Sequence, residues 1–132
     1  MWQLEQLGNV TIVTFAVHQL NEVEVGEFQS RLAAVAREGA NVIFDLSRVQ
    51  FLDSSGLGAI VVAHHRLRNL GGKLLLCCPQ PSVQSVFDLV CLGQQVDIHE
   101  HRDSALRELG TRPPWDTTRS VRPTRRRAAP NA

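Results

Sequence analysis

The feature that most constrains the fold is a short apolar segment followed, after one loop, by a helix with a clear start and end. Residues 41–46 combine apolar and β-branched side chains, which is typical of a buried strand. Apolar residues then recur at helical spacing from Leu57 to Leu70, and Gly71 and Gly72 end the pattern. Because strands alternate with helices in this way along the chain, the sequence predicts a layered α/β fold.

The start of this helix carries two serines beside an aspartate. Asp53 or Ser54 is expected to be the N-cap, so a serine hydroxyl lies where backbone N–H groups lack partners and the helix dipole is positive. This position favours a phosphate, either in a ligand or attached to a serine, whereas the Asp53 carboxylate opposes the added charge. Each effect is worth about 0.3–1 kcal/mol at an exposed site. Spacing alone therefore leaves open both a phosphate site and a simple helix cap.

Turn and capping signals place the other elements within residues 1–110. Gly8 and Asn9 predict a tight turn between two opening strands. Strands are expected at about 2–7, 9–17, 41–46, 73–78 and 95–99, and helices at about 22–38, 54–70, 81–90 and from residue 102 or 103 to 109. The sequence thus predicts an α/β fold in which a mixed sheet of about 4–5 strands, opened by an N-terminal hairpin, packs with about four α-helices.

Charge separates a domain from a basic tail. Residues 1–110 carry 8 basic and 12 acidic side chains, whereas residues 111–132 carry six arginines and one aspartate. The second segment is rich in Pro, Arg, Thr and Ala and has no apolar periodicity, so we predict one domain over 1–110 and a disordered tail over 111–132. The tail could contact nucleic acid or an anionic membrane, but apart from Trp115 no aromatic or amphipathic pattern organises its arginines, which favours a solvated extension.

The cysteines and the apolar content bear on the class of protein. The chain has no run of about 18 uncharged apolar residues and no signal-peptide pattern at its start, so we expect no membrane span and a cytoplasmic location. Cys77, Cys78 and Cys91 are odd in number and lack Cys-x-x-Cys spacing, which argues against a disulfide framework and a zinc site. Adjacent Cys77 and Cys78 are expected to point to opposite faces of a strand, with Cys78 extended because it precedes Pro79.

The sequence gives little support for an enzymatic function. Ser54 lacks the Gly-x-Ser-x-Gly elbow, since Leu52 stands two residues before it, and His64 lies roughly 15 Å further along the predicted helix. His99 and His101 could offer two metal ligands but are expected to be solvated surface residues. No glycine-rich phosphate loop is present. We therefore expect no catalytic residues, no metal and no cofactor.

Residues 45–58 resemble the signature segment of the STAS domain, whose best-known members are the bacterial anti-sigma factor antagonists. In that family a strand ending in Asp-Leu leads through a short loop to Asp-Ser-Ser-Gly-Leu-Gly, which matches residues 53–58 here. The resemblance extends over about 42–109. It implies a STAS-like fold in which Ser54 is phosphorylated by a partner kinase. The residues implied to form the docking surface around it are Asp53, Ser55, Gly56 and Leu57.

The resemblance implies a regulatory binding module that is not an enzyme. Such a module binds an anti-sigma factor serine kinase when Ser54 is unmodified, and phosphorylation weakens the complex. The family usually carries Gly-Glu-Leu-Asp or similar after the second strand, whereas this chain has VHQLN at 17–21. That difference motivates a second hypothesis, a STAS scaffold subunit that associates with itself or with other STAS proteins without covalent switching. A third hypothesis is nucleic-acid or membrane contact through the Arg-rich tail.

Overall fold

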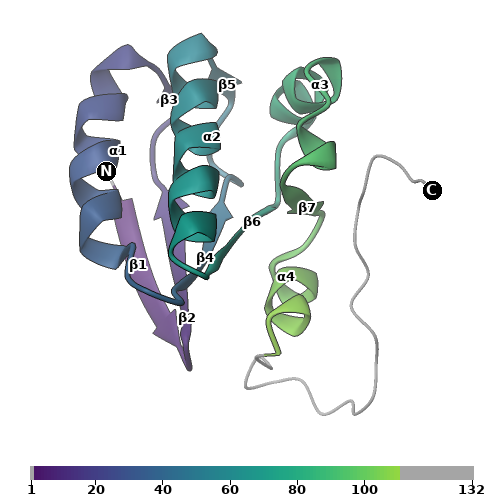
Figure 1. The fold of residues 1–132 in the computed structure, drawn as a ribbon. Coiled ribbons are helices and arrows are strands. Elements are labelled where there is room, and N and C mark those ends of the chain that lie inside the picture. The colour runs from purple at the N-terminus through teal and green to yellow at the C-terminus, as the bar shows by residue number, and fades with distance from the viewer. Residues whose placement is uncertain (1, 111–132) are drawn as a thin grey trace.

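Five strands form the central sheet, in the order β1-β2-β4-β6-β7 (Figure 1). The computed structural model describes residues 2–110, without the side chains of residues 2 and 22–25. An antiparallel hairpin of β1 (Trp2–Leu7) and β2 (Val10–Phe15) opens the chain. Strands β4 (Asn41–Asp45), β6 (Lys73–Cys77) and β7 (Asp97–His99) continue the sheet in parallel with β2. The predicted mixed sheet with an N-terminal hairpin is confirmed.

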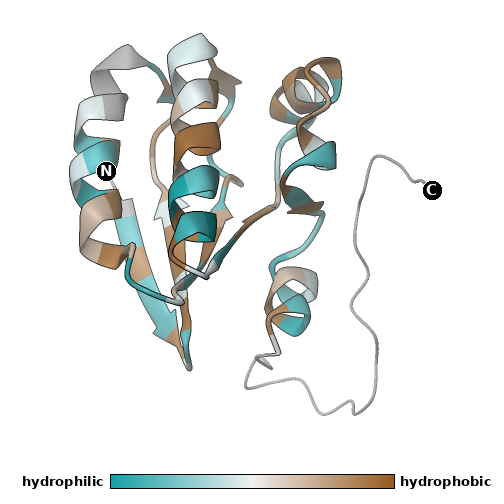
Figure 2. Ribbon diagram, in the orientation of Figure 1, coloured by the Kyte–Doolittle hydropathy of each residue, from teal (hydrophilic) through white to brown (hydrophobic). Residues whose placement is uncertain are grey.

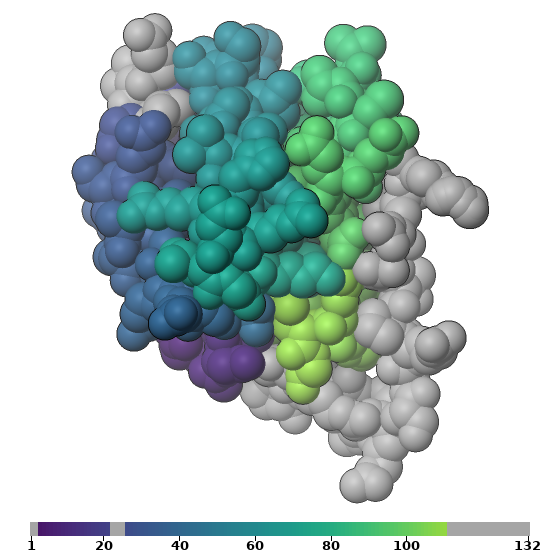
Figure 3. All heavy atoms as spheres, in the orientation of Figure 1, coloured from purple at the N-terminus to yellow at the C-terminus, as the bar shows by residue number. Residues whose placement is uncertain are grey.

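Four α-helices are present, as predicted: three connect strands and the last follows β7, and their bounds lie within a few residues of those expected. They are α1 (Glu22–Val35), α2 (Ser54–Asn69), α3 (Pro81–Leu89) and α4 (Arg102–Glu108), and a 3-10 turn, η1 (Leu92–Gln94), follows α3. In Figure 3, α1 and α2 lie side by side on one face of the molecule, with α3 next to α2. The last turns of α2 are hydrophilic, whereas its middle is hydrophobic (Figure 2).

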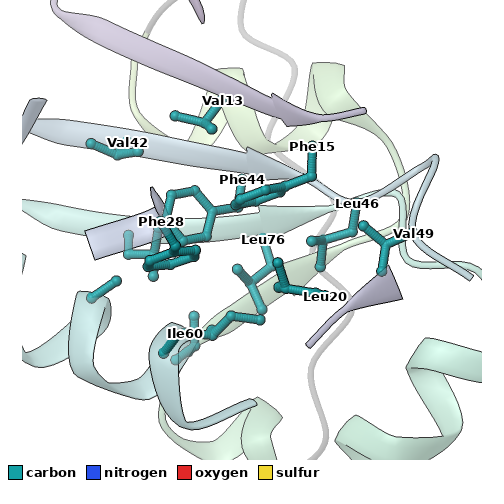
Figure 4. Packing of buried hydrophobic residues seen from close by; sticks show 14 of the residues in the cluster. Val13, Phe15, Leu20, Phe28, Val42, Phe44, Leu46, Val49, Ile60 and Leu76 are labelled. Atoms are coloured by element: carbon teal, nitrogen blue, oxygen red, sulfur yellow. The ribbon is translucent and has the colours of Figure 1, made fainter. Parts of the chain in front are cut away.

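The core has two layers because side chains alternate along each central strand. On one face of the sheet, Phe15 of β2 stacks on Phe28 of α1 with ring centroids 5.7 Å apart, and Phe44 of β4 meets both rings edge-on (Figure 4). On the other face, α4 contributes Ala105 and Leu106 to a smaller cluster. Its buried strand residues are Val10, Ile12, Ile43, Leu75 and Cys77. Apolar burial on both faces fits a central parallel strand covered by helices.

A second, two-stranded parallel sheet was not predicted. It pairs β3 (Gln19–Leu20) with β5 (Phe51–Leu52). Two residues per strand are too few to show an alternating pattern, so the sequence gives no periodic signal for it. Because β5 ends one residue before the N-cap of α2, this small sheet holds the start of that helix in place.

Candidate functional site at the start of the second helix

The start of α2 is capped by Asp53. Its backbone is extended, with φ −97° and ψ −175°, and its Oδ1 accepts a hydrogen bond of 2.9 Å from the Gly56 N–H. The sequence left Asp53 and Ser54 open as the N-cap, and the structure identifies Asp53. Ser54 is therefore the first helical residue, and its side chain is exposed. An exposed hydroxyl thus lies at the positive end of a 16-residue helix.

Backbone contacts with the 17–21 segment fix the position of this cap. The carbonyl of His18 accepts hydrogen bonds from the N–H groups of Gln50 and Phe51 at 2.8 and 3.0 Å. The Leu20 carbonyl lies so close to Gly56 that a Cβ on Gly56 would be 2.3 Å from its oxygen. Only glycine fits there without movement of the backbone. The segment that departs from the family pattern is thus built into the support of the serine-bearing helix.

The predicted docking residues differ in exposure. Ser54 is exposed, Asp53, Ser55 and Leu57 are half-buried, and Gly56 is buried beneath Leu20. The surface also includes Phe51, which the sequence analysis did not select and which is 58% exposed. A phenylalanine this open, three residues before Ser54 in the sequence, supplies apolar contact area on the segment that leads into α2.

His64 does not form a catalytic pair with Ser54. His64 lies in the third turn of α2, with its ring 5.2 Å from that of His65. Burial, followed by the charges of His65 and Arg68, lowers the pKa of His64. Roughly 15 Å of helix separate it from Ser54, which is too far for proton transfer between the two side chains.

The expectation that His99 is a solvated residue was wrong, whereas His101 is exposed as expected. His99 is fully buried, and its Nε2 lies 2.7 Å from Oε1 of Glu108. The second Glu108 oxygen accepts from the Lys73 ammonium at 2.6 Å. The helix α4 covers this end of the sheet, and that tertiary contact is invisible in the strand pattern. His99 therefore belongs to a buried polar cluster.

The expected orientation of the adjacent cysteines was also wrong. Cys78 is not extended: its φ is +61°, so the chain turns as soon as β6 has ended at Cys77. The two thiols consequently lie together, with their sulfur atoms within 4.8 Å of each other. The Cys78 N–H is bound to the His99 carbonyl at 2.9 Å, and this bond holds the turn.

A pocket of about 370 Å³ lies near the far end of α2, away from Ser54. Its lining residues are His64, Arg68, Gly72, Lys73, Leu74, Gln95 and Asp97. Lys73 already pairs with Glu108 at 2.6 Å and with Asp97 at 3.4 Å. The charge of this lysine is therefore satisfied within the fold.

In residues 2–110, no helix combines the length and the apolar character needed to cross a bilayer.

Comparison with known proteins assigns the family. The STAS domain family model matches residues 1–105, and the chain therefore belongs to the STAS domain family. The anti-sigma F factor antagonist of Lysinibacillus sphaericus is 28% identical over 94 residues, which cover 70% of this chain and 80% of the relative.

Solved structures share the fold. The anti-sigma factor antagonist SpoIIAA in its unphosphorylated form has a TM-score of 0.69 at 24% identity, covering 83% of this chain and 97% of that one. The Bacillus cell fate determinant SpoIIAA in its phosphorylated form has a TM-score of 0.64 at 22% identity, covering 83% and 99%. These likenesses confirm the predicted STAS-like fold.

Proposed function

We propose that this protein is an anti-sigma factor antagonist whose binding to an anti-sigma factor serine kinase is switched by phosphorylation of Ser54. The observation that carries the proposal is the exposed Ser54 hydroxyl at the capped N-terminus of α2, within the sequence Asp-Ser-Ser-Gly-Leu-Gly. A sequence relative bears the name anti-sigma F factor antagonist, and a structural neighbour is described in both phosphorylated and unphosphorylated forms. Membership of the same family supports the transfer of this role.

A phosphate at this position changes the surface without dismantling the helix. It adds about 1.5–2 negative charges at pH 7, which the helix dipole stabilises and the Asp53 carboxylate opposes. Ser54 has no part in the cap, because Asp53 supplies the oxygen that binds the Gly56 N–H. The fold can therefore accept the modification while the local charge of the contact surface changes.

The proposed contact surface combines the serine with apolar area. Phe51 is the exposed aromatic residue next to the site, and Leu57 is half-buried one turn into the helix. Ser55 and Asp53 contribute polar groups at its rim, and Gly56 acts from below by allowing the helix to approach Leu20. A dianion in the middle of such a surface would have to be desolvated on binding, so an interface formed around the neutral hydroxyl is weakened.

The test uses the full chain, ATP and the candidate kinase encoded nearest to this gene. Mass spectrometry is expected to find one phosphate on Ser54 in the wild type and in Ser55→Ala, and none in Ser54→Ala. Unmodified protein should bind the kinase, and Ser54→Asp should bind at least about tenfold more weakly, equivalent to 1.4 kcal/mol. Phosphate on another residue would contradict the proposal. Equal binding by the wild type and Ser54→Asp would favour the scaffold hypothesis instead.

A further inference from the structure

Three side chains with metal-binding atoms meet at the carboxyl ends of β4 and β6, a site that the proposed function does not use. Asp45 and Cys77 end these neighbouring parallel strands and are register partners. Cys78 follows Cys77 directly. One atom from each, the two sulfurs and a carboxylate oxygen, all lie within 4.8 Å of one another. Asp45 and Cys77 are buried and Cys78 is half-buried, so the group is reached from the Cys78 side.

The backbone at Cys78 is what brings the sulfurs together. Continued strand geometry would send adjacent side chains to opposite faces. Instead Cys78 adopts φ +61°, a left-handed conformation that is unfavourable for a residue other than glycine. Hydrogen bonds hold the turn on both sides, from the Cys78 N–H to the His99 carbonyl at 2.9 Å and from the Leu46 N–H to the Cys77 carbonyl at 3.0 Å. The surrounding fold thus maintains an unfavourable conformation whose effect is to pair two thiols.

The electrostatic environment of the group suits a divalent cation bound by two thiolates. The Asp45 carboxylate is balanced by Arg102, whose Nη2 and Nε lie 2.7 and 3.2 Å from its Oδ2. Two thiolates balance a divalent cation in turn, so the loaded group carries no net charge. Cys77 is fully buried and Cys78 is half-buried, so the Cys78 sulfur is the one that an arriving cation reaches first.

We propose that Cys77, Cys78 and Asp45 form a binding site for a thiophilic divalent cation of the Zn²⁺ or Cd²⁺ type. Two sulfurs with a single carboxylate select such ions over Mg²⁺ and Ca²⁺, which require several oxygen ligands. A tetrahedral zinc ion about 2.3 Å from each sulfur places its ligands roughly 3.8 Å apart, so the three groups need to close by about 1 Å at most.

Binding breaks two S–H bonds and forms two metal–sulfur bonds, and two protons pass to solvent. Asp45 supplies the third ligand while it keeps its contact with Arg102, since each carboxylate oxygen has more than one lone pair. Water fills the fourth position on the Cys78 side. The spacing argument against a zinc site missed this arrangement, because it rests on Cys-x-x-Cys pairs and on extended geometry at Cys78.

The test titrates the reduced full-length protein with Cd²⁺ against a competing chelator and follows the ultraviolet thiolate-to-metal charge-transfer band. We expect one equivalent bound. Cys78→Ser should weaken binding at least about 100-fold, whereas Cys91→Ser, which alters the exposed cysteine after α3, should leave it unchanged. Asp45→Asn should keep the band and weaken binding at least tenfold. Zn²⁺ should compete for the same site.

Cadmium NMR of the loaded wild type provides a readout that needs no variant, because the chemical shift reports the number of sulfur ligands. Two sulfurs are expected, and one or none would overturn the proposal. It is also overturned if the wild type shows no band at micromolar free Cd²⁺, if Cys91→Ser abolishes the band, or if the two cysteines close into a disulfide and exclude the metal under reducing conditions. Circular dichroism of each variant confirms that it is folded.

Discussion

At the scale of single residues, two glycines that lie two positions apart in α2, on nearly opposite sides of the helix, have opposite surroundings. A Cβ on Gly56 would meet the Leu20 carbonyl oxygen at 2.3 Å, whereas a Cβ on Gly58 would meet nothing within 4 Å. Both lie in the same helix, so their helix propensities are comparable and the difference between them is steric. This pair therefore isolates the cost of the close approach on which the candidate site rests.

We predict that Gly56→Ala lowers the free energy of unfolding by about 1–3 kcal/mol. The atom that would clash is the Leu20 carbonyl oxygen, which belongs to the backbone and cannot move away by a side-chain rotation. Gly58→Ala should instead raise it by about 0.5–1 kcal/mol, since alanine is the better helix former. Urea denaturation followed by circular dichroism measures both. A Gly56→Ala protein as stable as the wild type would show that β3 and α2 are not held against each other as described.

Which residues could be predicted from sequence depends on whether their environment is local. A cap at Asp53 or Ser54 follows from a signal within four residues, and the structure has it at Asp53, with Ser54 exposed as the first helical residue. The burial of His99 beneath α4 depends on contacts between distant segments, as does the left-handed turn at Cys78. No local sequence pattern predicts the burial of His99 or the left-handed conformation of Cys78.

At the scale of elements, α4 is held to the sheet by a buried acid. The Glu108 side chain is 9% exposed, and its two oxygens contact His99 and Lys73. Burial alone would raise the pKa of Glu108, but the hydrogen bonds from His99 and Lys73, reinforced by the lysine charge, outweigh it and hold that pKa far below its ordinary value of 4.5. The contact therefore favours the folded state only while Glu108 is ionised.

We predict that this contribution to stability is fully present above about pH 5.5 and is lost as the pH falls through 4.5 and below. In that range the Glu108 carboxylate binds a proton in the unfolded chain, whereas in the folded chain it stays ionised to lower pH. Glu108→Gln should be less stable than the wild type at pH 7, and the difference should shrink in acid. The control is Glu27→Gln, whose partner Arg31 lies on the exposed face of α1; it should change stability by under about 1 kcal/mol. Denaturation curves between pH 3 and 7 make the comparison. A constant gap across that range would contradict the prediction.

The elements that could be predicted from the sequence are those bounded by clear capping or turn residues. The helix from Ser54 begins at a cap and ends near two glycines, and its observed end at Asn69 differs from the expected one by a single residue. The pairing of β3 with β5 was not predicted, because it depends on where the 17–21 segment and residue 51 meet in space. Strand order likewise depends on tertiary packing, and only the hairpin was placed from a turn signal.

At the scale of the whole molecule, the buried residues of the described chain run from Val10 to Leu106. The predicted domain boundary at residue 110 lies just beyond them. The tail that follows changes the net charge of the chain from −4 for residues 1–110 to +1 for all 132. The buried residues that the structure describes therefore all lie before the segment that reverses the sign of the net charge.

We predict that truncation after Gly110 leaves the free energy of unfolding within about 0.5 kcal/mol of the full chain, as for changes that touch no buried contact. Truncation after His101 is the matched control, because it removes α4 and should abolish cooperative unfolding. Thermal and urea denaturation test both. Loss of folded signal in the 1–110 protein would move the domain boundary into the tail. Salt-sensitive binding of DNA by the full chain, but not by the 1–110 protein, would support the nucleic-acid hypothesis.

One side chain ties together the two ends of the described chain. Arg102 at the start of α4 reaches Glu5 on β1 at 3.0 Å, Thr14 on β2 at 3.2 Å and Asp45 on β4 at 2.7 Å. Its guanidinium group therefore closes a loop of nearly a hundred residues, so the first strand and the last helix can complete their contacts only once both have been synthesised. A growing chain emerging from the ribosome remains unfinished at its N-terminal edge until this arginine arrives.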